Sequence, residues 1–202
     1  MNVTGVVQAG GKATRMGGDP KGLIELGGKK VIERILDALA PALSDLLIVT
    51  NTPELYGFLG LPMVPDVFPD HGSLGGIYSG LKTVKGDAAF TVACDMPFLH
   101  PEVVRLVLAH AGEADVVIPK VGEQLETMHA LYSKACLPHM EAVLSAKRFK
   151  IVGFFDKVRV RIISEDDVAR FRSPDTCFMN VNTPEELSRA REILARLEHD
   201  QL

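Results

Sequence analysis

The sequence contains no tryptophan, only 6% aromatic residues and only three cysteines. The cysteines (Cys94, Cys136 and Cys177) are far apart and form no Cys-x-x-Cys pair, which argues against a disulfide framework and favours a reducing, cytoplasmic setting. No apolar run approaches the roughly 18 residues of a membrane span, and the first residues read as a strand rather than as a signal peptide. A formal charge of −4 argues against a general binder of nucleic acids or anionic membranes.

Several familiar catalytic patterns are also absent. Neither Ser73 nor Ser79 stands in a Gly-x-Ser-x-Gly sequence, so the nucleophile elbow of a hydrolase is missing. The six histidines form no His-Glu-x-x-His pair and, with the scattered cysteines, no zinc-binding spacing. One of them, His129, falls on a predicted strand, and we expect a satisfied, partly buried side chain there rather than a catalytic base.

The chain has 202 residues, of which 47% are hydrophobic, and predicts a single domain over residues 1–202. Apolar strands alternate with amphipathic helices, which predicts a three-layer α/β/α, Rossmann-like fold around a mostly parallel mixed sheet. The segment 158–163 alternates charged and apolar residues, as an edge or antiparallel strand does. Strands are expected at 3–8, 46–49, 62–65, 88–93, 115–119, 128–132 and 158–163, and helices at 31–43, 76–84, 101–111, 134–146 and 184–197. The last helix opens with a capping box, Thr183-Pro184-Glu185-Glu186.

A glycine-rich loop follows the first strand and reads Ala9-Gly10-Gly11-Lys12-Ala13-Thr14-Arg15-Met16-Gly17-Gly18-Asp19-Pro20-Lys21. Glycines let the backbone approach phosphate oxygens, and lysine and arginine side chains neutralise phosphate charge. Five basic and two acidic residues fall between Lys12 and Lys30, so positive charge is concentrated near this loop. The loop is therefore predicted to hold the phosphates of a nucleotide, although many such loops are only turns.

Two better-known phosphate loops do not fit this segment. It lacks the Gly-x-Gly-x-x-Gly spacing of the dinucleotide fingerprint. Gly17 and Gly22 have the glycine spacing of a P-loop, but Leu23 and Ile24 stand where that loop needs lysine and serine or threonine.

Asp95 is the first candidate for catalysis because it follows the apolar strand 88–93, at the same sheet edge as the glycine loop. Mg²⁺, which accompanies nucleoside triphosphates, prefers carboxylate and phosphate oxygens. Asp95 is thus a predicted metal ligand, and the alternative is a turn-forming residue before Pro97. Asp66, Asn51 and the second glycine loop at 72–76 are candidate nucleotide contacts, with ordinary loop roles as the alternative.

Together these motifs resemble the MobA-type molybdenum cofactor guanylyltransferases, nucleotidyltransferases with a glycosyltransferase-A-like fold. The chain departs from the family pattern at Gln8, where the family has leucine, and at Arg148-Phe149-Lys150, where it tends to show paired arginines. The resemblance is carried by Ala9-Gly10-Gly11, Arg15-Met16-Gly17, Lys21-Gly22, Leu26-Gly27-Gly28-Lys29, Asn51, Asp66, Leu74-Gly75-Gly76, Cys94-Asp95-Met96-Pro97 and Asn180-Val181-Asn182-Thr183-Pro184-Glu185-Glu186-Leu187.

The resemblance implies that GMP is transferred from GTP to the terminal phosphate of molybdopterin, releasing pyrophosphate and forming the guanine dinucleotide cofactor. It implies catalytic roles for Lys21, Arg15 and Asp95, with Mg²⁺ on Asp95, and pterin contacts at Asn180 and Asn182. Further partners would be molybdenum-cofactor biosynthesis proteins and the molybdoenzymes that accept the product. The implied nucleotide contacts are Gln8, Ala9, Gly10, Gly11, Lys21, Asn51, Asp66 and Asp95.

Other functions remain open at this point. Another nucleotidyltransferase could use CTP with the same pterin, or act on a sugar phosphate or phospholactate. Related cytidylyltransferases tend to carry Leu-Ala-Ala-Gly, so Gly10 favours guanine over cytosine. A non-catalytic GTP-binding protein would bind the nucleotide without releasing pyrophosphate. A dehydrogenase is disfavoured by the missing dinucleotide fingerprint.

Overall fold

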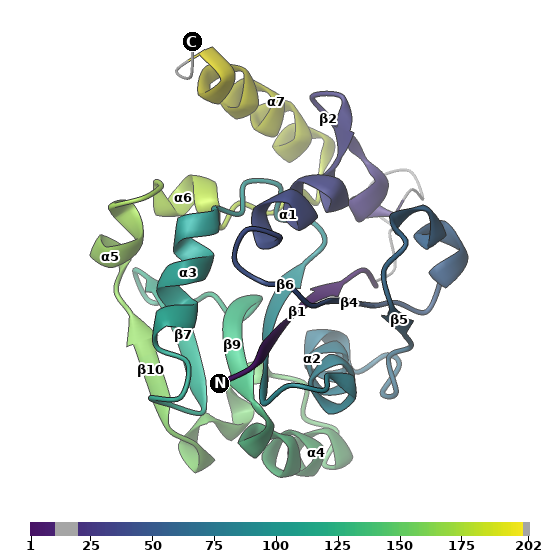
Figure 1. The fold of residues 1–202 in the computed structure, drawn as a ribbon, viewed down its shortest axis with the longest axis vertical. Coiled ribbons are helices and arrows are strands. Elements are labelled where there is room, and N and C mark those ends of the chain that lie inside the picture. Colours follow the sequence, from purple (N-terminus) through teal and green to yellow (C-terminus); the bar gives the residue numbers. More distant parts are fainter. Residues whose placement is uncertain (11–19, 200–202) are drawn as a thin grey trace.

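The computed structural model describes residues 1–10 and 20–199, which form an α/β fold around a mixed central sheet (Figure 1). The strand order of this sheet is β10 (Val160–Ile163), β7 (Val116–Val121), β9 (His129–Ser133), β6 (Ala88–Ala93), β1 (Val3–Gln8), β4 (Leu46–Val49) and β5 (Met63–Val64), with β8 (Gln124–Leu125) paired to β7. β1 is parallel to β4 and β6, β4 is parallel to β5, and β7 is parallel to β10, whereas β9 is antiparallel to β6 and β7. The predicted mostly parallel sheet is therefore confirmed.

The helices of the described residues are α1 (Val31–Leu39), α2 (Gly72–Thr83), α3 (Pro101–Ala109), α4 (Leu137–Ser145), α5 (Glu165–Ala169), α6 (Pro174–Cys177) and α7 (Pro184–His199). They cover both faces of the sheet, as Figure 1 shows for α1 and α3 on one side and α2 and α4 on the other. Successive strand residues point to opposite faces, so Val7 packs in the core beneath α1 and α3 while Val6 packs beneath α2 and α4. This confirms the three-layer prediction. Short 3₁₀ helices are η1 (Lys21–Leu23), η2 (Pro53–Leu55), η3 (Gly57–Leu59), η4 (Lys134–Cys136) and η5 (Ile151–Lys157). None of the helices described is both long and apolar enough to cross a bilayer.

A two-stranded hairpin, β2 (Glu25–Leu26) and β3 (Lys29–Lys30), explains the Leu-Gly-Gly-Lys motif. Its two turn residues, Gly27 and Gly28, have φ of +58° and +74°, a conformation that a two-residue hairpin turn requires and that glycine adopts without strain. A Cβ on Gly27 would lie 2.3 Å from Cδ2 of Leu194 in α7. The motif is therefore structural, because it lets the hairpin pack against the last helix.

α2 begins at Gly72, four residues before its predicted start at Gly76. Glycine is a weak helix former, so the sequence pattern left Gly72 and Gly75 outside the helix. In the structure the glycines of α2 permit close packing: a Cβ on Gly76 would lie 2.5 Å from Oε1 of Gln8, and one on Gly80 would lie 2.5 Å from Cγ1 of Val6. Tertiary packing of the helix on β1 thus overrides the low propensity.

Other differences occur elsewhere, and the end of α1 lies four residues before the predicted residue 43. β10 is an edge strand, as expected, and it pairs in parallel with β7. The first helix ends at Leu39, two residues before Pro41, because proline does not continue a helix. The sequence patterns did not predict β8, α5, α6 or η5, which are all short or irregular.

Candidate active site

The carboxyl ends of three parallel strands meet at one edge of the sheet. The last residue of β1, Gln8, is in register with Val49 of β4 and with Ala93 of β6. The residues that follow these strands, among them Gly10, Asn51 and Asp95, consequently emerge side by side. α1 connects β1 to β4 and α2 connects β5 to β6 from the opposite face, so a crevice forms where the connections diverge.

Two adjoining hollows, of about 590 and 510 Å³, open along this crevice. Gln8, Gly10, Asn51 and Ser73 line both of them, so they form one continuous cleft. The larger hollow is also lined by Ala9, Pro20, Lys21, Thr52, Leu55, Tyr56, Ala93, Cys94, Asp95 and Met128. The smaller hollow is also lined by Val49, Thr50, Asp66, Pro69, Asp70, Gly72 and Gly76.

Lys21 and Asp95 form an ion pair in the wall of the larger hollow. The Lys21 ammonium lies 3.0 Å from Oδ2 of Asp95, and the two side chains are only 29% and 13% exposed. Gly22 permits this contact because it packs directly on Cys94; a Cβ there would lie 3.2 Å from that of Cys94. The other carboxylate oxygen, Oδ1 of Asp95, is buried and has no hydrogen-bond partner among the residues described.

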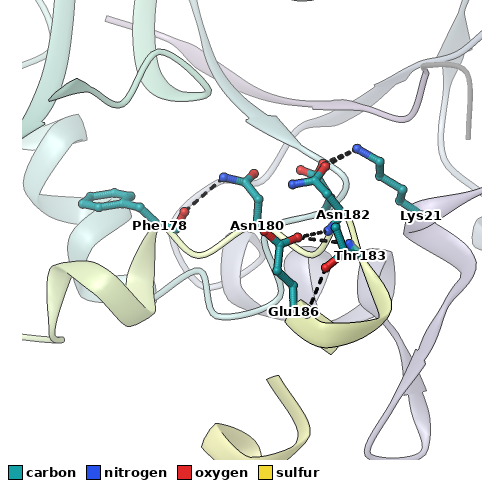
Figure 2. A network of polar contacts seen from close by, with 7 residues as sticks. Lys21, Phe178, Asn180, Asn182, Thr183 and Glu186 are labelled. Atoms are coloured by element: carbon teal, nitrogen blue, oxygen red, sulfur yellow. Dashed lines mark hydrogen bonds and ion pairs between the residues drawn. The ribbon is translucent and has the colours of Figure 1, made fainter. Parts of the chain in front are cut away.

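The same lysine also donates a hydrogen bond to the side-chain oxygen of Asn182 (Figure 2). The backbone N–H of Val181 donates to the carbonyl of Asp95 at 2.8 Å, which fixes the segment 180–183 beside the end of β6. Sequence analysis placed Lys21 on the nucleotide side and Asn182 on the pterin side. The structure joins these two residues through one ammonium group.

The predicted capping box holds this segment in place. The Glu186 carboxylate accepts the N–H groups of Asn182 and Thr183 at 2.6 and 3.0 Å, and Oγ1 of Thr183 accepts the N–H of Glu186 (Figure 2). Asn180 donates its side-chain N–H to the Phe178 carbonyl at 3.3 Å. Both asparagines are therefore presented by a short, well-bonded loop before α7.

Gln8 presents an unsatisfied amide to both hollows. Its side chain packs on the bare backbone of Gly76, and within the described part of the chain its buried Nε2 has no hydrogen-bond partner. Such an orphan donor is costly unless a ligand satisfies it. Beside it, the N–H of Ala9 already donates to the Val49 carbonyl at 2.9 Å.

Asp66 and Asn51 organise the loop after β5. Oδ1 of Asp66 accepts the N–H of Phe68 at 2.9 Å and the hydroxyl of Ser79 at 3.0 Å, while Asn51 accepts the N–H of Asp66. Asp66 also packs on Gly75, where a Cβ would lie 3.0 Å from its carboxylate oxygens. Both residues line the smaller hollow, and part of their hydrogen-bonding capacity is used by the loop itself.

Two predicted residues, Gly11 and Arg15, lie outside the residues that the structure describes. Conversely, Tyr56 and Met128 line the larger hollow although sequence analysis did not single them out. Their local sequences carry no chemical signal, because only the tertiary fold brings η2 and the turn before β9 to this cleft.

The expectation that the His129 side chain is partly buried and satisfied was wrong. It is fully buried, and neither ring nitrogen has a hydrogen-bond partner among the residues described. It lies between the rings of Phe90 and Phe178, with centroid distances of 5.2 and 4.9 Å. Burial lowers the pKa of His129 to about 3, so the imidazole is neutral at physiological pH. Burial also raises the pKa of the Cys94 thiol to about 12, so Cys94 provides no thiolate nucleophile.

His129→Leu should therefore make the fold more resistant to acid. An ordinary histidine has a pKa near 6.5, so the unfolded chain takes up a proton below that pH while the folded chain does not until about pH 3. This group costs the wild type on the order of 2–3 kcal/mol of stability by pH 4.5. Urea unfolding at pH 7 and 4.5 measures the effect; equal losses in wild type and variant would contradict it.

The residues 5–158 match the family model for the MobA-like NTP transferase domain. The chain belongs to this family. It is 36% identical over 191 residues to the probable molybdenum cofactor guanylyltransferase of Pelotomaculum thermopropionicum, covering 95% of this chain and 93% of that protein. It is 38% identical over 190 residues to the molybdenum cofactor guanylyltransferase of Desulfosudis oleivorans, covering 93% and 94%. The family is one of nucleotidyltransferase enzymes, as the resemblance implied.

Solved structures of the family's fold agree with this assignment. The molybdopterin-guanine dinucleotide biosynthesis protein A of Archaeoglobus fulgidus superposes with a TM-score of 0.82 at 26% identity, covering 96% of this chain and 99% of that one. A more distant neighbour, Rv0371c of Mycobacterium tuberculosis in complex with manganese, shares the fold with a TM-score of 0.68 at 15% identity and coverage of 95% and 99%.

Proposed function

We propose that this enzyme transfers GMP from GTP to the terminal phosphate of molybdopterin and releases pyrophosphate, forming the guanine dinucleotide cofactor. The observation that carries the proposal is the contact of Lys21 with both Asp95 and Asn182. It joins a phosphate-binding cation, a carboxylate and the 180–183 segment at one point of a cleft large enough for a nucleotide. The family membership and the names of its relatives support the same activity.

In this proposal the nucleotide occupies the part of the cleft lined by Gln8, Gly10 and Asn51. No described atom lies within 4 Å of the position that a Cβ on Gly10 would take, so a base can approach the backbone there. The unpartnered amide of Gln8 supplies a hydrogen bond to the base. Ala9 and Asp66 line the same region, and we assign Gly11 and Arg15 to the phosphates by resemblance alone.

Mg²⁺ fits the donor set at Asp95. Oδ1 of Asp95 is buried and finds no partner in residues 1–10 and 20–199. A single carboxylate with substrate phosphates and water is a common magnesium environment. Among the residues described, no group of three or more His, Cys, Asp or Glu side chains forms an all-protein metal site. When bound, the ion would neutralise phosphate charge and make the α-phosphorus more electrophilic.

The chain's own residues then act by alignment and charge. The terminal phosphate of molybdopterin has a second pKa of about 6 and is largely ionised at neutral pH, so no general base is required. One of its oxygens bonds to the α-phosphorus of GTP as the bond from that phosphorus to the bridging oxygen breaks, and the electron pair leaves with pyrophosphate. Lys21 stabilises the phosphate charge while Asn180 and Asn182 position the acceptor.

Pyrophosphate release tests the proposed reaction. The purified protein is incubated with each of the four nucleoside triphosphates, with Mg²⁺, and with or without molybdopterin. We expect release only when GTP and molybdopterin are both present. Release with CTP and molybdopterin would indicate a cytidylyltransferase, and GTP binding without release would indicate a binding protein. In a separate reaction a sugar phosphate replaces molybdopterin, and release there would indicate another transferase.

We further infer that residues 1–202 act as one nucleotidyltransferase domain in the cytoplasm. Cys94, Cys136 and Cys177 are buried and free, which suits a reducing compartment. Limited proteolysis that yields a stable, active fragment much shorter than the chain would contradict the single domain.

A further inference from the structure

Glu126 is a half-buried carboxylate without a partner. It lies in the turn between β8 and β9, and among the described residues its side chain makes no hydrogen bond or ion pair. Burial alone raises the pKa of Glu126 to about 7. Removing a carboxylate from water without compensation is unfavourable, which makes Glu126 a candidate for binding a hydrogen-bond donor of a ligand.

The turn that carries Glu126 is held rigidly next to the cleft. The N–H of Glu126 donates to the Pro119 carbonyl, and the Glu126 carbonyl accepts the N–H of His129, both at 2.9 Å. The hydroxyl of Tyr132 bonds the Thr127 carbonyl at 2.8 Å. Two residues after Glu126, Met128 lines the larger hollow. The backbone position of this carboxylate is therefore fixed at the edge of the site.

Glu126 is connected to the segment that presents the two asparagines through His129 and Phe178. The ring of His129, the residue bonded to its carbonyl, packs on Phe178, whose own carbonyl accepts the amide of Asn180. Burial raises the pKa of the Cys177 thiol in α6 to about 12, and the charge of nearby Glu126 contributes to the rise. His129 and Cys177 are therefore both neutral at physiological pH. Arg172, whose charge also acts on Cys177, forms no ion pair with Glu126 among the residues described.

The strand order indicates which of the two substrates, nucleotide or acceptor, lies nearer to Glu126. The order β9-β6-β1-β4 places Asp95, after β6, between Glu126 at the start of β9 and Asn51 after β4. Gln8 and Asn51 line the nucleotide part of the cleft, so Glu126 lies on the other side of the reacting centre. That side holds Asn180 and belongs to the acceptor.

We propose that the Glu126 carboxylate selects the acceptor by binding the two adjacent N–H donors of a 2-amino-4-oxopyrimidine ring, as found in a pterin. This inference rests on the proposed function. The exocyclic amino group and the neighbouring ring N–H form the same paired donor that arginine offers to a carboxylate, with two parallel hydrogen bonds. Guanine carries the same donor pair, and the position of Glu126 on the acceptor side distinguishes the two rings.

Glu126→Gln tests the proposal because it preserves size and removes the charge. We expect KM for molybdopterin to rise about 10- to 100-fold while KM for GTP stays within about twofold. The matched control is Glu123→Gln in the same hairpin, whose side chain is 97% exposed and pairs with Lys120. It should behave as wild type. An unchanged KM for molybdopterin, or a rise in KM for GTP instead, would overturn the proposal.

A competition experiment identifies the ring edge directly. 6-Hydroxymethylpterin and the matching lumazine, which has a carbonyl in place of the 2-amino group, are compared as inhibitors of wild type and variant. Wild type should bind the pterin at least about tenfold more tightly, and Glu126→Gln should lose that preference. A preference that persists in the variant would contradict the assignment.

The pH profile separates this role from a structural one. Below about pH 7 Glu126 becomes protonated, so wild-type affinity for the acceptor should weaken between pH 8 and 6. In the variant this change in affinity should be absent, and affinity should fall only near pH 6, where the phosphate of the acceptor becomes protonated. If wild type releases no pyrophosphate with GTP and molybdopterin, the proposed function fails; if it does and the variant matches it at both pH values, only the role of Glu126 fails.

Discussion

Asp95→Asn should lower kcat by about 10²- to 10⁴-fold, because roughly 3–5 kcal/mol of transition-state stabilisation depends on that carboxylate. Its orphan Oδ1 is the oxygen available to Mg²⁺, and its Oδ2 holds Lys21 in place. An amide keeps the shape of the side chain but loses the negative charge that attracts the ion. The loss is measured as the steady-state rate of pyrophosphate release at saturating GTP and molybdopterin.

The fold itself should tolerate this change. Lys21 retains its hydrogen bond to Asn182 and is 29% exposed, so it is not left as a buried, unpaired charge. The melting temperature should consequently shift by only a few degrees. Asp37→Asn is the matched control, since Asp37 pairs with Lys29 at the surface, where both side chains are more than half exposed. It should retain full activity, and near-normal turnover in Asp95→Asn would remove the metal role.

The magnesium dependence of the rate tests the metal role of Asp95 separately. In the wild type, activity should saturate with Mg²⁺ at a concentration set partly by Asp95. In Asp95→Asn the Mg²⁺ concentration for half-maximal rate should rise by about tenfold or more. If only kcat falls and the magnesium dependence is unchanged, Asp95 acts through Lys21 and not through the ion.

The fold was largely predictable because its central strands have two buried faces. Parallel strands of this kind read as continuous apolar runs, which is why β4 and β6 begin and end at the predicted residues. Where a predicted boundary was wrong, packing against other elements explains the difference. The start of α2 depends on contacts of Gly75 and Gly76 with Asp66 and Gln8, which no local pattern encodes.

The sequence predicted which candidate site residues lie together only where the topology of the sheet determines their positions. Residues that follow parallel strands share one edge, so Gln8, Asn51 and Asp95 could be placed together from the sequence. The contact between Lys21 and Asn182 joins positions 161 residues apart and has no sequence signal. Glu126 was missed for a similar reason, because its chemistry arises from burial and from the absence of a partner.

Lys21→Ala should weaken GTP binding by about 10- to 100-fold and slow the transfer step, since a charge-assisted hydrogen bond to a phosphate contributes roughly 1.5–3 kcal/mol. Lys21 is the lysine that contacts Asp95, and it is held there by η1. Lys21→Met keeps the aliphatic stem and should show the same loss, which excludes a packing effect. Calorimetric titration with GTP and Mg²⁺ measures the affinity, and an unchanged affinity would remove Lys21 from the nucleotide site.

The melting temperatures of the Lys21 and Asp95 variants should differ. Removal of the lysine leaves Asp95, only 13% exposed, as a carboxylate with neither oxygen paired to a described residue, at a cost of about 1–3 kcal/mol. Lys21→Ala should therefore melt at a lower temperature than Asp95→Asn, although it removes the more exposed partner. The double variant should be no less stable than Lys21→Ala alone, because the stranded charge has gone. Added Mg²⁺ should raise the melting temperature of Lys21→Ala and leave that of the double variant unchanged; the same rise in both would show that the ion does not bind Asp95.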